Sequence, residues 1–468
     1  MARILLLYLP SFVGLIWDAL PRFSIAWSVA GSFFIAIITQ TRWFREPDDD
    51  IPVTQRLLRP ISVYQFYFLG FQVVGSAFYA LNAAGYNFHG QVAMPQESKL
   101  ELIAQLQSYM LLAHASVMAG MKLVGFKYGK PRYVIPALPP YGLILISFIS
   151  LGAGTVATMI SPLYNLGLKL FDLSLTAILV ETWLSVRRGH FTNQALTLSV
   201  LGFNLFGQIL SGWKGLVLWS AITLGGMFFP LMPKRVIVVG TAFFLFWVLF
   251  LHPFGQLYRP LTWYYEIKPE IAIEMAKEYA LNLTMEERLD NLWETMIDRV
   301  NDMWQFEKYV QHVPDRRPYY GFDLIQEAMI ALVPRILWPE KPDLERVAMQ
   351  RVYEAGVVSE NTPVSAKTSF YIDGYLSGGW LAMALASLGY GVVAVFVSRA
   401  CERLFGGYDI GTCFIYVGLF TFWINSGPNF LFFVGAIWTS FVTMFGLFVA
   451  GRGAGWIVPA RPAQAAPA

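Results

Sequence analysis

Residues 331–342 read ALVPRILWPEKP, and they place cations and an aromatic residue on a backbone stiffened by prolines. The apolar run before them should end at Pro334, because proline lacks an amide proton and clashes with the preceding helical turn. Two further prolines favour an extended backbone after it. We therefore expect Arg335 and Lys341 on a stiff loop, which loses little entropy when it binds a ligand. Paired guanidinium nitrogens match phosphate oxygens, so this pattern predicts binding of a diphosphate.

Further side chains around this segment could take part in binding. The additional cations are Arg316, Arg317, Arg346 and Arg351, and the aromatic candidates are Trp338, Tyr319 and Tyr320. The aromatic rings could stack on sugar faces. The alternative is that both kinds of side chain only anchor the loop at the headgroup level of a membrane.

Two other positions combine a charge with small residues. Lys214 lies in the stretch SGWKG, where glycines permit close backbone approach, and it would point into an outer cavity; the alternative is a lysine that snorkels to the interface. Asp373 stands at the start of a later apolar run and could orient a sugar hydroxyl or act as a base. Its alternative role is to satisfy the dipole at a helix N-terminus.

The composition indicates which type of fold must position these residues. The chain has 468 residues, of which 56% are hydrophobic and 14% charged, and its mean hydropathy is +0.49. Soluble proteins carry about 25% charged residues. Apolar runs of ~20 residues, each enough to cross ~30 Å of hydrocarbon, recur along the chain. The predicted fold is an all-α polytopic membrane protein of about twelve spans, near residues 3–20, 23–41, 61–83, 103–125, 139–161, 166–186, 193–211, 215–231, 236–256, 374–398, 409–428 and 430–450.

Basic residues alternate between the loops and predict sidedness. Arginines and lysines cluster in the loops after the second, fourth, sixth, eighth and tenth spans and in the tail, whereas the other short loops hold single cations. Both termini are therefore expected in the cytoplasm. This divides the chain into spans one to nine (1–256), an external loop (257–373), spans ten to twelve (374–450) and a cytoplasmic tail (451–468). In a bacterium the external loop would face the periplasm or the exterior.

The external loop is too long for a linker and too apolar for disorder. Thr284-x-x-Glu287 is a capping box that predicts a helix start, and apolar residues recur at helical spacing for ~25 residues after it. That amphipathic helix could lie on the membrane or pack on the bundle, and packing is favoured. The apolar segment 322–333 is too short to cross and fits a re-entrant or interfacial helix.

Several classes of function are disfavoured. The sequence has no clustered histidines and cysteines, no P-loop, no GxGxxG and no paired acidic motif outside the acidic run 46–50, which is interpreted as a solvated face. Neither a metal nor a nucleotide cofactor is therefore expected. The formal net charge of +3 argues against nucleic acid as a partner.

The segment PR-x-x-WP-x-KP within 330–342 resembles the external-loop motif of bacterial oligosaccharide repeat-unit polymerases of the Wzy type. Tyr320-Gly321 precedes it, the SGWKG element resembles a short element of that family, and Ser369 to Trp380 resembles the family's acid-then-glycine entry to the next span. Asp373 stands there where the family pattern has Glu. The predicted topology, with one large external loop late in the chain, is also similar.

The resemblance implies polymerisation of undecaprenyl-diphosphate-linked repeat units into surface polysaccharide or exopolysaccharide, on the outer face of a bacterial inner membrane. Arg335, Lys341 and Lys214 would stabilise the diphosphate leaving group without a metal. Asp373, Asp323, Glu327 and His312 are the candidates for the base. A flippase and a chain-length regulator are conceivable protein partners. A lipid-linked glycan ligase, a flippase or other transporter, and a non-catalytic scaffold remain as alternatives.

Overall fold

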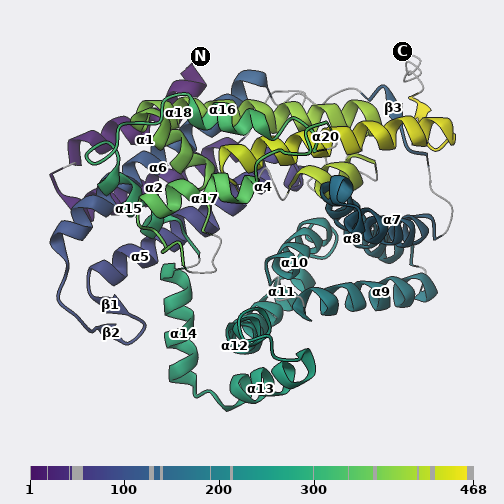
Figure 1. The fold of residues 1–468 in the computed structure, drawn as a ribbon, viewed down its shortest axis with the longest axis horizontal. Helices are drawn as coiled ribbons and strands as arrows, with labels where there is room; N and C mark the ends of the chain where they lie inside the picture. The colour runs from purple at the N-terminus through teal and green to yellow at the C-terminus, as the bar shows by residue number, and fades with distance from the viewer. Residues whose placement is uncertain are drawn as a thin grey trace.

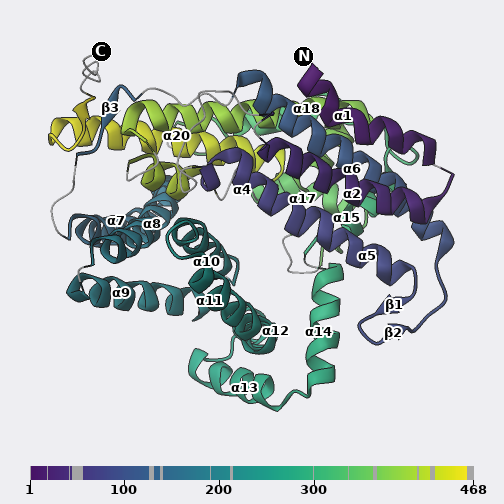
Figure 2. The ribbon, with the colours of Figure 1, turned by 180° about the vertical axis from the view of Figure 1, so that it is seen from behind.

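The computed structural model describes residues 2–17, 19–41, 43–44, 56–125, 131–136, 141–189, 191–210, 214–298, 300–335, 337–361, 366–407, 411–421 and 427–460. Within them the protein is all-α apart from four two-residue strands. Figure 1 shows two groups of helices, one containing both chain ends and a second below it, and Figure 2 shows the same grouping from behind.

Eight helices of the described chain are long and apolar enough to cross a membrane. They are α2 (Pro21–Gln40), α4–η2–α5 (Pro60–Tyr67, Phe68–Val74 and Gly75–Ala83), α6 (Glu97–Val124), α7 (Gly142–Met159), η3–α8 (Ser161–Leu163 and Tyr164–Arg188), α11–η4–α12 (Pro233–Phe246, Trp247–Leu251 and His252–Trp263), α18 (Phe370–Phe405) and α20 (Phe430–Gly453). Their lengths of 18 residues and more correspond to ~27 Å or longer. This is the architecture of a multi-pass membrane protein.

The other four expected spans do not reach this standard in the structure. Helix α1 (Ala2–Gly14) and α10 (Lys214–Phe228) are shorter, and α9 (Phe191–Leu210) contains two Asn and two Gln residues. The region near 409–428 contains η5 (Cys413–Thr421), whereas residues 422–426 lie outside the described chain. The structure thus supports eight spans, and the expected number of about twelve is not confirmed.

Close backbone contact fixes α6 against α18 in the first group. A Cβ on Gly120 would lie 2.0 Å from the carbonyl oxygen of Leu388, and one on Gly391 would lie 2.1 Å from that of Val117. Only glycine fits at such a crossing, which is the usual way in which small residues let membrane helices approach. The rigid core of this group carries the site described below.

The two ends of the first group agree with the alternation of basic loops. At one end Arg399 donates to the carbonyl of Gly125 at 2.8 Å, and strand β3 (Tyr133–Val134) pairs with β4 (Val458–Pro459). At the other end a hairpin of β1 (Tyr86–Asn87) and β2 (Gly90–Gln91) meets the long loop, where His89 contacts Asp290 at 2.9 Å. Loops expected on one side therefore lie together.

The long loop forms five helices, α13 (Pro269–Asn282), α14 (Met285–Asp298), α15 (Met303–His312), α16 (Asp323–Ile330) and α17 (Leu344–Glu354). The capping box is confirmed. The amide of Thr284 donates to Glu287 Oε2 at 2.8 Å, and the amide of Glu287 donates to Thr284 Oγ1 at 3.3 Å. Helix α14 packs on α5, where the Trp293 indole donates to Asn82. Packing on the bundle is thus the observed arrangement.

The prediction of one helix of ~25 residues is wrong, because the helix is interrupted between α14 and α15. The cause is Asn301, whose side-chain amide donates to the carbonyls of Met296 at 2.9 Å and Ile297 at 3.2 Å. Its oxygen accepts from the amide of Met303 at 2.9 Å. One side chain thus satisfies the end of α14 and the start of α15, since each helix end leaves backbone groups unpaired.

Candidate functional site

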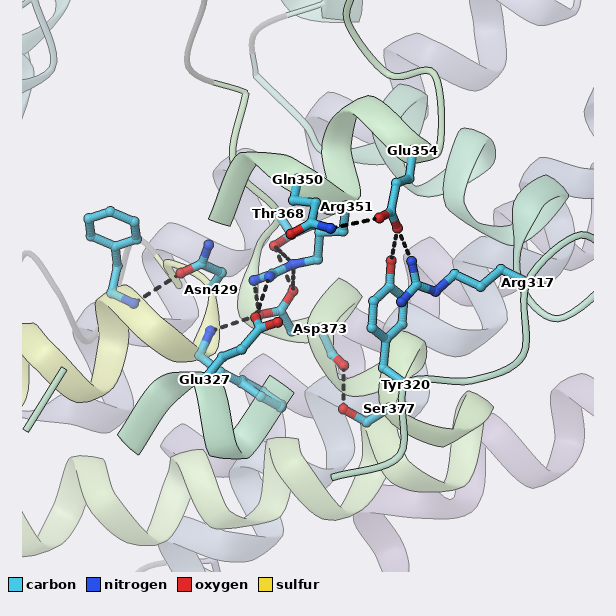
Figure 3. Close-up of polar contacts among 12 residues, drawn as sticks. Arg317, Tyr320, Glu327, Gln350, Arg351, Glu354, Thr368, Asp373, Ser377 and Asn429 are labelled. Carbon is cyan, nitrogen blue, oxygen red and sulfur yellow. Dashed lines mark hydrogen bonds and ion pairs between the residues drawn. The ribbon is translucent and has the colours of Figure 1, made fainter. Parts of the chain in front are cut away.

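A buried arginine from the long loop lies at the centre of the site. Arg351, in the last turn of α17, is 3% exposed and donates through Nε to Asp373 Oδ1 at 3.1 Å and through Nη2 to Asp373 Oδ2 at 3.0 Å (Figure 3). This is the bidentate geometry in which guanidinium and carboxylate bind most strongly. Burial opposes the charge on Arg351, but Asp373 and Glu327 outweigh it and raise its pKa above the ordinary value. The arginine is therefore permanently charged.

Asp373, in the first turn of α18, is fully buried and has several donors. Besides Arg351 it accepts from Thr368 Oγ1 at 2.6 Å and from the backbone amide of Phe430, at the start of α20, at 2.9 Å. Both of its oxygens are thus occupied, and the carboxylate joins α17, α18 and α20. This geometry suits an anchor better than a base that must reach a substrate.

Glu327, on α16, is the partly exposed member of the cluster. Its Oε2 accepts from Arg351 Nη1 at 3.1 Å, its side chain is 31% exposed, and Oε1 has no hydrogen-bond partner among the described residues. Burial raises the pKa of Glu327, Arg351 opposes this effect, and Asp373 adds to it. A carboxylate that is bound at one oxygen, free at the other and has a raised pKa can accept a proton.

A second cluster lies beside the first on α17. Glu354 pairs with Arg317, accepts from the hydroxyl of Tyr320 at 3.0 Å and receives Gln350 Nε2 at 3.1 Å (Figure 3). The guanidinium of Arg317 stacks on the Tyr320 ring at 3.9 Å. Burial and Glu354 raise the pKa of Tyr320, so its hydroxyl stays protonated and donates. This cluster fixes the chain between α15 and α16 against α17.

The two cations of the proline-containing segment, Arg335 and Lys341, differ in exposure and in contacts. Arg335 is exposed, and no partner is found for its side chain among the described residues, while Trp338 is 37% exposed. Lys341 is only 9% exposed, and its Nζ donates to the carbonyls of Val333 at 2.9 Å and Ala331 at 3.4 Å. Burial and then Arg335 lower the pKa of Lys341. In the structure the carbonyls after α16 bind the ammonium group of Lys341, and its expected contact with a ligand stays a prediction.

The remaining candidates are spread around these clusters. Arg316 and Arg346 are exposed, as is Asp323 at the start of α16, and His312 is partly buried at the end of α15. Tyr319 packs edge-on against Tyr375, with ring centroids 6.0 Å apart, beside Gly379 where α18 is kinked. Lys214 begins α10, and its neighbours 211–213 lie outside the described residues. The side chain of Lys214 also lies outside the described part of the chain, so its expected role stays a prediction.

The structure adds residues that the sequence patterns do not single out. Thr368, the backbone amide of Phe430, Gln350 and Glu354 all bond to members of the two clusters. Glu354 had a detectable signal, since it follows Arg351 by three positions and so lies on a neighbouring part of the same helix face. The amide of Phe430 had no signal in the sequence, because only the packing of α20 brings it to Asp373.

Fold and site together define the class: an all-α, multi-pass membrane protein whose long loop docks a buried arginine onto the ends of two membrane helices. Within that class, the chain belongs to the family described as a domain of unknown function, DUF8712, whose model matches residues 9–455. No curated protein and no solved structure matches the chain. The family match covers all eight candidate spans and the long loop, so spans and loop form one unit of sequence.

Proposed function

We propose that the protein is a glycosyltransferase that joins oligosaccharide units carried on undecaprenyl diphosphate, on the outer face of a bacterial inner membrane. One observation carries the proposal. The partly exposed carboxylate of Glu327 is fixed by the buried Arg351, and the helix that carries Glu327 leads directly into the loop that exposes Arg335 and Trp338.

The chemistry needs a base and a site for a leaving diphosphate. The open oxygen of Glu327 takes the proton of the acceptor hydroxyl, whose oxygen attacks the anomeric carbon of the donor sugar. The bond from that carbon to the diphosphate oxygen breaks, and the diphosphate leaves with the bonding electrons. Arg335 stabilises the departing charge, and Trp338 offers a ring face to a sugar.

The arrangement narrows the list of sequence candidates. Asp373 has no oxygen left for an acceptor hydroxyl, so Glu327 is the preferred base. Arg351 is buried and paired with two carboxylates, which leaves Arg335 as the preferred cation for the diphosphate, with Arg346 and Arg316 as further exposed charges. Lys341 contributes by closing the loop that presents Arg335.

The test is deletion of the gene, complementation with variants and gel analysis of the surface polysaccharide. We expect deletion to leave single repeat units where wild type makes long chains. Arg335→Ala should give the same pattern at normal protein level, and Arg335→Lys should restore little, because lysine lacks the paired donors. Lys277→Ala, an exposed lysine on α13, is the matched control and should make full-length chains.

Other outcomes identify the alternatives. Full-length chains that stay on their lipid carrier after deletion would indicate a ligase. Loss of every exported unit would indicate a flippase. Normal chains from Arg335→Ala would remove the central assignment.

A further inference from the structure

An apolar cavity of about 410 Å³ lies between the two groups of helices. None of the residues that line it belongs to the Arg351 cluster. Its wall comes from the start of α4, from α10 and α11, and from η5, and includes Phe66, Trp219, Ile222 and Val417. The volume falls within the ~300–1,000 Å³ of ligand pockets. An apolar hollow among helices that cross a membrane can hold a hydrocarbon chain.

Two adjacent glycines keep this cavity open. A Cβ on Gly225 would meet nothing closer than Val236 Cγ1 at 3.9 Å, and one on Gly226 nothing closer than Leu58 Cδ2 at 3.9 Å. Each glycine in a helix costs ~1 kcal/mol relative to alanine. Membrane helices usually accept that cost where backbones must approach closely. No such approach occurs at either glycine, so here their effect is to leave space.

Within the described part of the chain, the charged residues next in sequence to the cavity wall are basic, and one of them, Arg59, is paired with Glu402 at 3.8 Å. Leu57 and Leu58, at its wall, follow Arg56 directly, and Val236 follows Lys234 and Arg235. Lys234 and Arg235 are exposed in the first turn of α11. The helices α4, α10, α11 and η5 contain no Asp or Glu. An occupant with an apolar chain and an anionic head therefore matches the cavity and its rim, as in basic lipid sites between membrane helices.

We propose that this cavity binds one acyl chain of an anionic glycerophospholipid whose phosphate lies against Arg56, Lys234 and Arg235. The sequence places these three residues in loops two–three and eight–nine, on the side opposite the long loop, so the lipid comes from that leaflet. The bound chain fills the space between α4 of the first group and α10 and α11 of the second. The site is independent of the proposed glycosyl transfer and joins the two groups.

The first experiment is native mass spectrometry of the full chain purified in detergent and supplied with phosphatidylglycerol or phosphatidylethanolamine. Wild type should retain one phosphatidylglycerol in preference to phosphatidylethanolamine. Gly226→Leu should fill the cavity and lower retention by about tenfold or more, the factor that corresponds to 1.4 kcal/mol. The matched control is Gly240→Leu on α11, where the glycine also faces open space but does not line the cavity; it should retain the lipid.

Removal of charge tests the rim. Lys234→Gln with Arg235→Gln should weaken phosphatidylglycerol binding about 30-fold, equivalent to about 2 kcal/mol for two charges, and leave phosphatidylethanolamine unchanged. Arg187→Gln with Arg188→Gln removes a comparable exposed pair at the end of α8 and should have no effect.

A measurement on the unaltered protein avoids any folding defect of the variants. Phosphatidylglycerol with a photoreactive group in its acyl chain should label peptides of α4 or α10 in wild type, and excess unlabelled lipid should compete. Labelling confined to other helices would overturn the proposal. So would unchanged retention in Gly226→Leu, or recovery of a polyprenyl phosphate instead of a glycerophospholipid.

Discussion

Arg351, in the last turn of α17, and Arg335, ahead of that helix, belong to the same loop, yet they have opposite surroundings. Arg351 is 3% exposed and shares its nitrogens among Asp373, Glu327 and Thr368, whereas Arg335 is exposed, with no partner found among the described residues. A buried, paired arginine fixes structure, because moving it would leave the buried carboxylate of Asp373 without its cation. An arginine in solvent can pair with a substrate. The comparison teaches that the Arg351 cluster holds the loop in place, whereas the adjacent segment with Arg335 is free to bind a substrate.

The largest expected effect follows from substitution of the buried arginine. Arg351→Ala leaves Asp373 buried without its main partner and should cost about 3–5 kcal/mol of stability. Thermal unfolding in detergent and the protein level in membranes would measure the loss. Arg346→Ala, on the exposed side of the same helix, is the control and should stay within about 0.5 kcal/mol of wild type. Equal stability of the two variants would contradict the structural role of Arg351.

The next effect concerns the open carboxylate. Glu327→Gln should lower the rate of chain growth by about 100-fold or more while the protein remains folded, because an amide cannot accept the proton. Since burial raises the pKa of Glu327, wild-type activity should fall on acidification at a higher pH than for an ordinary glutamate. Rates measured against pH in both proteins would show whether that acid limb disappears in the variant. Glu278→Gln on α13 is the matched control. An unchanged limb in Glu327→Gln would assign the base elsewhere.

A smaller effect should follow when the loop is no longer closed. Lys341→Met removes the donor to the carbonyls of Val333 and Ala331 and should cost about 1.5–3 kcal/mol, the usual range for a hydrogen bond to a charged group. Hydrogen exchange in 331–341 should accelerate, and Lys277→Met should change neither stability nor exchange. If Lys341→Met abolished chain growth without faster exchange, Lys341 would contact the substrate directly.

The smallest effect lies far from both arginines, at the capping box. Thr284→Ala should destabilise α14 by about 1 kcal/mol, because the amide of Glu287 loses its acceptor. Hydrogen exchange of α14 would detect the change, with Thr262→Ala, whose hydroxyl bonds within its own helix, as the control. Faster exchange at the Arg351 cluster in the same variant would show that the two parts of the loop are coupled.

The local features of the fold were predictable. The capping box marks the start of α14, and the apolar runs mark the eight candidate spans, because both depend on residues close together in sequence. The side of the membrane on which each loop lies stays a prediction from the alternation of basic residues. The length of the helix after the capping box was not predictable, since Asn301 breaks it through its side chain within an otherwise helical pattern.

The members of the site were predictable only in part. The sequence identifies four of them by charge and position near the membrane: Asp373, Glu327, Arg351 and Arg335. It does not show that Asp373 is the buried anchor and that Glu327 keeps a free carboxylate oxygen. That distinction depends on which oxygen meets which donor. The donors come from α17, from Thr368 before α18 and from the start of α20, up to 57 residues away in the chain.

The sequence by itself therefore determined an all-α membrane protein, the positions of its long apolar helices and a cation-rich loop between two of them, because hydrophobic length and local capping act over a few turns. Only the tertiary structure decided that Arg351 is buried on two carboxylates, that Lys341 turns inward and that Arg335 stays exposed. The physical reason is that a charge in a loop takes the partner that folding brings to it, and burial then makes that pairing costly to break.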